Sequence, residues 1–503
     1  LRQGRSLLLV ASVNNNDQTT DRDYYSNGSG KTSKVSPDKA TIAYTYSRKQ
    51  QESSTRTFRI QPTYRDKIGR HSTINIAYRL QAQLRSRDLM SYTTGSDYVI
   101  DPAKLNSRSS SSFEGMFLYH QAGMGYRYGR NRNWFSVSAM YQNSQLSNHN
   151  MWTGERTKRV YHTPVYNATL QWAFDSSNTL RVSATSEVKA PSLWQMLDIY
   201  DVSNSQYISI GNPDLRPYTE HNYFARYTNI SQRYGTTFMV MAKAMLRPDY
   251  IGTSIHYSPE TIEIDGKKYN PLQLSQPVNL DGYRSFEART SIGFPLTFIS
   301  SNLNISLGAT YSDVPIRLNG NDELMNNLTV STDWTLGSNI SENIDFTIRY
   351  NLSYSDNKAG RAVLNNQFLS HRATANFKAV LPLGFTLTTS GVYTQYVGIT
   401  NGYNDSFMLW NAAVGKKVLR NLGEVELCVN DLLNQNTSFA RSVWAGYSQV
   451  RYNSTMGRCF LVKFTYNIRA FTPGTKQLKI AKSSGVPTNF FDKVERTLNS
   501  LRF

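Results

Sequence analysis

Apolar and polar residues alternate along residues 343–354, which read Asn-Ile-Asp-Phe-Thr-Ile-Arg-Tyr-Asn-Leu-Ser-Tyr. A period of two predicts a β-strand with one apolar face and one polar face. The same pattern returns in three further segments, at residues 166–174, 303–311 and 460–468. No charged residue lies on the apolar faces of these segments, whereas Asp345, Arg349 and Lys463 lie on the polar faces. The pattern predicts an all-β protein.

The distribution of charge indicates which solvent each face meets. A charge at the middle of a bilayer costs about 2–4 kcal/mol on the lipid face of a barrel, whereas positions in the lumen tolerate it. The asymmetry therefore suits a transmembrane antiparallel β-barrel with its apolar side chains outward. A soluble sandwich would show the same alternation with the apolar face inward. Periodicity alone leaves both alternatives open.

The sequence predicts roughly nineteen strands. From residue 65 onward, the connections between them alternate between short and long. The short ones are 65–71, 129–133, 175–178, 295–300, 381–384 and 416–423. The long ones are 83–112, 145–160, 188–218, 248–281, 312–322, 357–366, 397–405 and 430–456. This rhythm is typical of outer-membrane barrels, which have short periplasmic turns and long outer loops. It fails before residue 65, and Pro62 predicts a bulge because proline cannot donate to the ladder.

Composition narrows the class further. The chain has 503 residues, of which 39% are hydrophobic, and no run of about 20 apolar residues predicts a transmembrane helix. Because only helices and closed barrels satisfy their backbone groups in lipid, a membrane-spanning chain of this kind must be a barrel. The 33 tyrosines suit interfacial girdles, although tyrosine is also a good strand residue.

The net charge of +19 predicts attraction between the outer loops and anionic lipopolysaccharide. The basic residues are dispersed and form no recognised motif, so nucleic acid is not expected as a partner. We expect no enzyme activity, since G-x-S-x-G, H-E-x-x-H and phosphate-binding glycine loops are absent. The seven histidines lack metal-ligand spacing, so neither a metal nor another cofactor is expected.

The two cysteines, Cys428 and Cys459, lie on the polar faces of neighbouring predicted strands. If Val429 pairs with Arg458, the two cysteines face each other across the lumen side. The sequence then allows a cross-strand disulfide, provided that the Cβ atoms approach to about 3.5–4.5 Å.

The long loop 188–218 holds the two most specific sequence motifs of the chain. One is Ala190-Pro191-Ser192-Leu193-Trp194, and the other is Gly211-Asn212-Pro213-Asp214-Leu215-Arg216-Pro217. Gly, Asn, Pro and Asp favour a tight turn, which Arg216 and Asp214 could pin by a charged hydrogen bond. We therefore expect a structural role for these residues rather than ligand contact.

Aromatic residues in the long loops are the candidate ligand contacts, because they could stack on a sugar or a catecholate. They are Trp152, Trp194, Tyr200, Tyr207, Tyr250, Trp444 and Tyr447. Arg216 and Arg441 could meet an anion. The alternative is that these side chains serve loop packing and lipid anchoring.

The two loop motifs resemble those of TonB-dependent outer-membrane receptors, in which an "AP-S-L" element precedes "GNPDLKPE". Here Arg216 replaces the usual Lys, and Tyr218 stands where Glu is usual. Residues 429–434 resemble the turn before the last strand of these receptors, and 457–467 resemble their closing strand. The style is most similar to the outer-membrane β-barrel family of Bacteroidetes.

The resemblance implies a barrel of about 22 strands in the parent protein, with residues 1–469 as its barrel part and the first strands and an N-terminal plug missing. It also implies a TonB complex that acts through the plug, uptake of a solute, and in some cases a surface lipoprotein. Haem is not expected, because no histidine lies between Pro191 and Asn212. The basic tail 470–503 is expected to hold a short amphipathic helix after Thr488, or to be disordered.

Two other function classes remain open at this point. One is a non-energised outer-membrane pore or an assembly scaffold. The other is a soluble secreted β-protein, which would be extracted without detergent.

Overall fold

The computed structural model describes residues 4–29, 42–106, 110–202, 206–257, 259–264, 267–338, 340–341, 343–358, 366–398, 404–419, 422–436, 439–444, 447–452 and 457–466. Over these residues the protein is all-β, and 22 strands join in one sheet. The basic tail predicted at 470–503, with its helix, lies outside the described residues. No described helix has the length and apolar character needed to cross a membrane.

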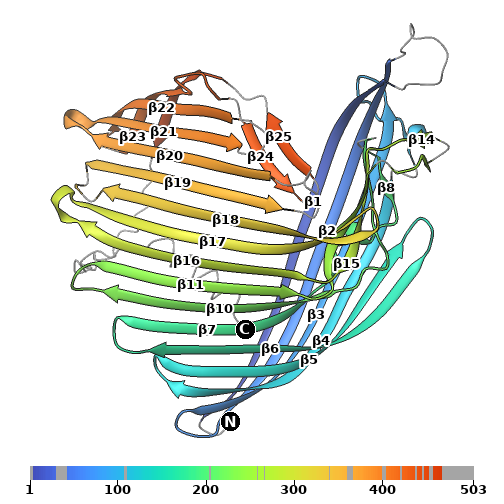
Figure 1. The fold of residues 1–503 in the computed structure, drawn as a ribbon, viewed down its shortest axis with the longest axis horizontal. Coiled ribbons are helices and arrows are strands. Elements are labelled where there is room, and N and C mark those ends of the chain that lie inside the picture. Colours follow the sequence, from blue (N-terminus) through green and yellow to red (C-terminus); the bar gives the residue numbers. More distant parts are fainter. Residues whose placement is uncertain are drawn as a thin grey trace.

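Eighteen of the 22 strands form an antiparallel meander in which each strand pairs with the next. They are β1 (Arg5–Ser29), β2 (Ile42–Lys67), β3 (Ser72–Thr94), β4 (Ser111–Arg130), β5 (Asn133–Asn150), β6 (Arg156–Ala173), β7 (Asn178–Lys189), β10 (Tyr218–Ser231), β11 (Thr236–Arg247), β16 (Tyr283–Leu296), β17 (Ser301–Leu318), β18 (Asn321–Ser338), β19 (Ile344–Lys358), β20 (Asn366–Val380), β21 (Phe385–Gly398), β22 (Asn404–Val418), β23 (Gly423–Asn430) and β26 (Cys459–Tyr466). The sheet curls around an interior, so that β1–β5 stand across from the run β16–β23 (Figure 1).

The other four strands of the sheet belong to two long loops. They are β8 (Tyr200–Asp201), β9 (Tyr207–Ile210), β12 (Tyr250–Tyr257) and β15 (Gln273–Leu280). Two hairpins stand apart from the sheet, formed by β13 (Ile262–Ile264) with β14 (Lys267–Tyr269) and by β24 (Phe439–Trp444) with β25 (Tyr447–Tyr452). Within the described residues β1 pairs with β2 alone and β26 with β23 alone.

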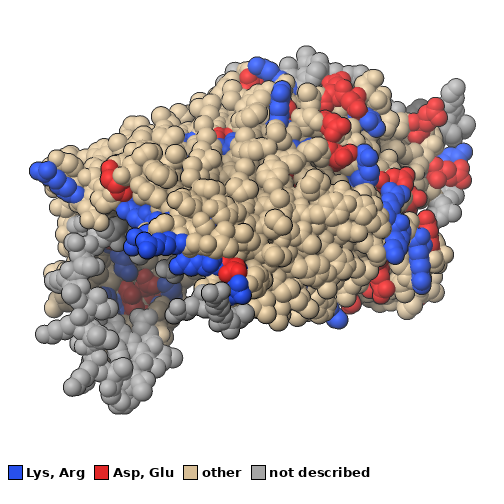
Figure 2. All heavy atoms as spheres, turned by 90° about the horizontal axis from the view of Figure 1, so that it is seen from below, with Lys and Arg blue, Asp and Glu red and all other residues tan. Residues whose placement is uncertain are grey.

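The two faces of the sheet match the predicted faces. Large apolar side chains point outward and are exposed, among them Phe460 (75%), Val462 (74%) and Leu307 (54%). The inward face carries charges that pair across strands, such as Arg289 with Asp333 and Lys463 with Glu426, both at 2.8 Å. On the face seen in Figure 2, a broad area nearly free of charged side chains separates the charged residues at the two ends. Lipid is the solvent that such an exposed apolar band requires.

The short connections that lie wholly within the described residues are confirmed as tight turns, and they place one end of the barrel at the periplasmic side. Three of the long connections, 83–112, 145–160 and 312–322, are shorter than predicted because much of their length is strand, whereas 188–218, 248–281 and 430–456 remain long. β3 continues to Thr94 and β17 to Leu318, and β1 and β2 span 25 and 26 residues. Roughly 9–11 residues cross a bilayer. Strands that project into water need no alternation, so their period was not recognised in the sequence.

Two predictions about individual positions are wrong. Pro62 creates no bulge, because the register is the same on both sides of it, with Ile60 opposite Leu80 and Thr63 opposite Ala77. The ladder simply lacks the bonds at the proline. The predicted pairing of Val429 with Arg458 is also displaced by two residues, since Val429 lies opposite Phe460.

This shift in register removes the predicted disulfide. Cys428 lies opposite Leu461, and Cys459 lies opposite Asn430, so the two cysteines are diagonal neighbours. Diagonal positions in an antiparallel pair lie about 7–8 Å apart, farther than a disulfide allows. Both cysteines are free thiols in the structure.

The larger cluster of buried apolar residues lies between the barrel wall and the loop that joins β7 to β10. Phe117 and Leu146 come from the inward faces of β4 and β5, and Met196 and Leu215 come from the loop. Leu215 is fully buried, at 0% exposure. The loop therefore folds back onto the lumen wall, where its apolar side chains find the inward side chains of the strands.

Candidate functional site

The loop begins with a turn whose hydrogen bonds are local. The backbone N–H and the hydroxyl of Ser192 both donate to Oε1 of Gln195, at 2.9 and 3.0 Å, and the N–H of Gln195 donates back to Ser192 Oγ at 3.3 Å. This is the reciprocal arrangement of a capping box. It starts the single 3₁₀ turn η2 (Trp194–Met196), which directs Trp194 toward the strands and buries Met196.

The second loop motif, residues 211–217, folds around Gly211 and Asn212. A Cβ atom on Gly211 would lie 2.1 Å from the carbonyl oxygen of Leu197, so only glycine fits there. The N–H of Asn212 donates to the Gln195 carbonyl at 2.7 Å, its side-chain amide donates to Pro277 of β15 at 3.0 Å, and its Oδ1 accepts from the N–H of Asp214 at 2.9 Å. Asn212 thereby joins both ends of the loop to the neighbouring loop strand.

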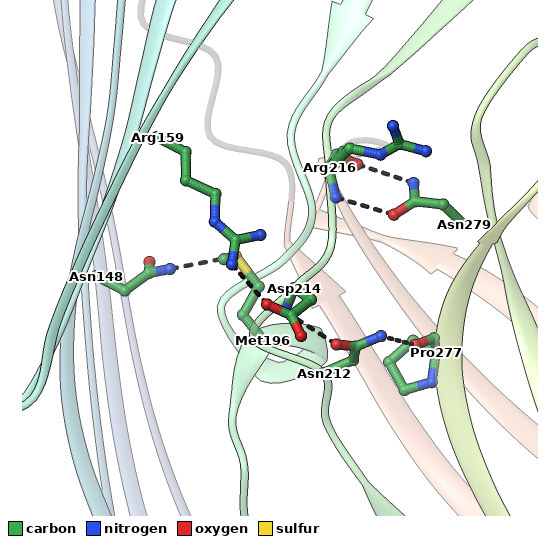
Figure 3. A network of polar contacts seen from close by, with 8 residues as sticks. All are labelled: Asn148, Arg159, Met196, Asn212, Asp214, Arg216, Pro277 and Asn279. Carbon is green, nitrogen blue, oxygen red and sulfur yellow. Dashed lines mark hydrogen bonds and ion pairs between the residues drawn. The ribbon is translucent and has the colours of Figure 1, made fainter.

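Asp214 and Arg216 pin the loop, but not to each other. Asp214 accepts from Arg159 of β6 at 2.6 Å, and this hydrogen bond raises the pKa of Arg159, which lies near the outer end of its strand. Arg216 pairs with Asp249 at 2.7 Å, while its backbone N–H and carbonyl are held by the side chain of Asn279. Figure 3 shows the contact of Asp214 with Arg159 and those of Arg216 with Asn279 on opposite sides of the loop.

The loop and the wall enclose a cavity of about 680 Å³ on the lumen side. Its floor comes from inward positions of β2 and β3, including Gln51, Arg85 and Arg87. Its other walls come from the loop, through Ala190, Ser192, Leu193, Trp194 and Gln195, and from Tyr218, Arg247, Tyr250 and Ile251.

The cavity is positively charged. Arg85, Arg87 and Arg247 line it, and no lining residue is acidic. Arg85 donates to the Pro191 carbonyl at 2.7 Å, and burial lowers the pKa of Arg85 and of Arg87. Arg247 is the one that Glu220 neutralises, at 2.7 Å. The cavity therefore offers the guanidinium groups of Arg85 and Arg87 to an anion, although the carboxylate of Asp201 acts electrostatically on Arg87.

Aromatic rings lie next to these guanidinium groups. The Cζ atom of Arg87 lies 4.5 Å from the ring centre of Trp194, and that of Arg247 lies 4.4 Å from Tyr283 and 5.8 Å from both Tyr218 and Tyr250. Arg87 donates to Gln51 at 2.9 Å, whereas its Nε atom is buried with no partner among the described residues. Such a pairing of ring faces and cations suits a ligand with an anionic group and a planar or sugar ring.

Of the predicted ligand contacts, Trp194 and Tyr250 line the cavity, while Tyr200 and Tyr207 do not. Trp444 ends β24, and its side chain lies outside the described residues. Ala190 lines the cavity, and the remaining motif residues, with Pro191 and Leu215 buried, shape the loop behind it. Sequence reasoning missed Arg85 and Arg87, because residues 83–112 were assigned to a loop, and it missed Arg247, which ends β11 just before the connection predicted at 248–281. The alternate positions Gln83, Arg85 and Arg87 were the available signal.

Comparison with a protein-family model supports the fold. A model of the outer membrane protein beta-barrel family matches residues 2–355 and 316–466. Similar solved structures include BauA, the ferric preacinetobactin receptor from Acinetobacter baumannii (10% identity, TM-score 0.41, 84% of this chain and 69% of that chain). The copper transporter OprC (10%, 0.40, 92% and 79%) and the siderophore receptor PiuA from Acinetobacter baumannii (10%, 0.40, 92% and 75%) are also similar. No curated protein sequence matches.

These structural likenesses are too distant to carry an argument. The family match does carry an argument, since it extends over nearly the whole described chain. A family of outer-membrane barrels places the protein in the outer membrane of a Gram-negative cell and agrees with the expectation that it is not an enzyme. The chain belongs to the outer membrane protein beta-barrel family.

Proposed function

We propose that the parent protein of this barrel takes up a solute across the outer membrane in a TonB-dependent manner. The observation that carries this proposal is the cationic, aromatic-lined cavity on the lumen side, at the outer end of the barrel, where an arriving solute would meet it. The first of the two loop motifs that resemble TonB-dependent receptors forms part of the wall of the same cavity, and the second shapes the loop behind it. The resemblance to proteins of Bacteroidetes and the partnership with a surface lipoprotein stay predictions of the sequence.

The solute we propose carries an anionic group beside a ring. Arg85 and Arg87 would hold the anionic group, since charge-assisted hydrogen bonds from arginine are short and directional. Trp194 and Tyr250 would cover the ring. Most pockets of this size use a few such polar groups to orient a ligand against apolar walls.

The experiment uses the full-length parent protein in native outer-membrane vesicles. Vesicles are incubated with a mixture of anionic sugars and catecholates, and the retained solutes are identified by mass spectrometry. The proposal expects one class to be retained and to be lost at least tenfold in Arg87→Gln and Trp194→Ala. The control Arg372→Gln changes a distant cation on the lumen face of β20 and is expected to bind normally.

The retained solute is then followed into cells with and without TonB. Accumulation that needs TonB supports a receptor. Accumulation that is unchanged without TonB would favour a non-energised pore, and no solute retained or accumulated would favour an assembly or scaffold barrel.

A further inference from the structure

A second cavity lies on the opposite, lipid-facing side of the same strands and has no place in solute uptake. It measures about 750 Å³ and runs over β2 to β6. Two rows of neighbouring positions form it. One row is Arg56, Leu84, Met116, Ser147 and Lys158, and the next is Ser54, Ser86, Glu114, His149 and Arg156.

The parity of these positions places them on the outer surface. Phe58 and Val160, which lie two residues below Arg56 and Lys158 on their strands, are exposed apolar residues, at 41% and 49%. Because side chains two residues apart in a strand share a face, the charged rows lie directly above the apolar band. They lie on the outer side of it, since the short turns mark the periplasmic end.

A set of Tyr–His contacts marks where that band ends. Tyr78 bonds His120 at 2.6 Å, Tyr166 bonds His221 at 3.1 Å, and Tyr350 bonds His371 at 2.8 Å, in each case between Oη and Nδ1. Each of these histidines lies about ten residues from the periplasmic end of its strand, the length needed to cross a bilayer. Tyrosine is typical of this boundary. The two rows lie just beyond it, at the level of the lipid head groups.

The cavity is cationic. Arg56, Arg156 and Lys158 line it, and Glu114 is its single acidic lining residue, although Asp17 of β1 lies beside Arg56. Arg156 and Lys158 form no ion pair with any described residue. Long basic side chains at this height can bind phosphate groups while their stems rest on the apolar surface below.

We propose that this groove binds the phosphate groups of lipopolysaccharide, with Arg56, Arg156 and Lys158 as the contacts. The acyl chains of the lipid would then lie against the apolar band around Phe58 and Val160. The outer leaflet is the phosphate source in contact with this surface, so lipid A is the ligand rather than free phosphate. This inference does not depend on the proposed solute or on TonB.

The test compares the full-length protein with the triple variant Arg56→Gln, Arg156→Gln, Lys158→Gln. A matched control, Arg349→Gln, Arg372→Gln, Lys378→Gln, removes the same charge from inward positions of β19 and β20. Each protein is purified in detergent, checked for heat-dependent migration as a folded barrel, and titrated with lipid A by native mass spectrometry. The single variant Lys158→Gln is measured in parallel, so that a triple variant that fails to fold still leaves a test.

We expect lipid A to bind the triple variant at least tenfold more weakly, the Lys158→Gln variant several-fold more weakly, and the control as the wild type. Dephosphorylated lipid A should bind the wild type and the triple variant equally. Equal binding of lipid A to wild type, triple and Lys158→Gln variants would overturn the proposal. So would an equal loss in the control, or inorganic phosphate competing at the same concentration as lipid A, which would indicate a free-phosphate site.

Discussion

Asp214 accepts a hydrogen bond from Arg159 at 2.6 Å, although the two residues are 55 positions apart and Arg216 is only two away. The partner of Arg216 is Asp249, on the other side of the loop. The two charges of the motif therefore hold the loop between β6 and the turn after β11, and Figure 3 shows the contact with Arg159 of β6. These two contacts fix the loop against the lumen wall, and the cavity depends on that position.

The polar contacts that hold this loop should differ in how much they stabilise it. Asn212→Ala is expected to destabilise the loop by about 1–2 kcal/mol, because it removes the partly buried bond to the Pro277 carbonyl and the bond from Asp214 N–H. Asp214→Ala should cost less than about 1 kcal/mol, since its side chain is 80% exposed. Amide hydrogen exchange of residues 206–217 measures both. A larger effect at Asp214 would contradict the role given to Asn212.

Gly211→Ala should displace the loop. The added Cβ would meet the Leu197 carbonyl at 2.1 Å, and backbone atoms cannot move away cheaply, so we expect a loss of about 1–3 kcal/mol. Limited proteolysis within residues 190–217 should become faster. Gly337→Ala is the matched control, because its Cβ would have no atom within 4 Å. Equal resistance of both variants to protease would argue against the close approach.

The lipid face can be tested at one strand. Leu307→Arg places a charge near the middle of the apolar band and should destabilise the folded barrel by about 2–4 kcal/mol. Ser306→Arg places the same charge on the adjacent inward position and should cost much less. Urea unfolding of both variants in lipid vesicles gives the comparison. Equal destabilisation would mean that the two faces have been assigned wrongly.

The register of the last strand pair predicts which thiols can be joined. The wild type should show two free thiols on titration in denaturant, because Cys428 and Cys459 are diagonal. The variant Leu461→Cys with Cys459→Ser places a thiol directly opposite Cys428, where the spacing suits a disulfide. Mild oxidation should therefore join this pair and leave the wild-type pair reduced. Rapid bonding in the wild type alone would indicate the other register.

The hairpin between β17 and β18 should loosen in acid. A hydrogen bond from the Arg317 guanidinium holds the pKa of Asp322 below its usual value, at the outer end of the hairpin. Since this pKa is lower in the folded state, the contribution to stability is present above the unfolded pKa and is lost as the pH falls through the folded pKa. Hydrogen exchange at residues 317–322 should rise accordingly. Asp322→Asn should abolish that part of the pH dependence.

The sequence by itself determined the all-β class, the two faces of the strands, the short periplasmic turns and the position of the motif loop. Lipid imposes a strict rule on each residue of a spanning strand, so that information is local and can be recognised in segments such as 303–311. Gly211 and Asn212 were likewise predicted to form a turn, because their preferences are properties of the residues themselves.

Only the tertiary structure decided what lies opposite what. Beyond the membrane the strands face water, which enforces no alternation. The outer part of β3, which ends at Thr94, could therefore be mistaken for a loop. The partner of Cys428 depended on a shift of two residues between strands, and the cavity joins β2, β3, the loop and β11. Such contacts result from the register of distant segments, which residue preferences and periodicity do not encode.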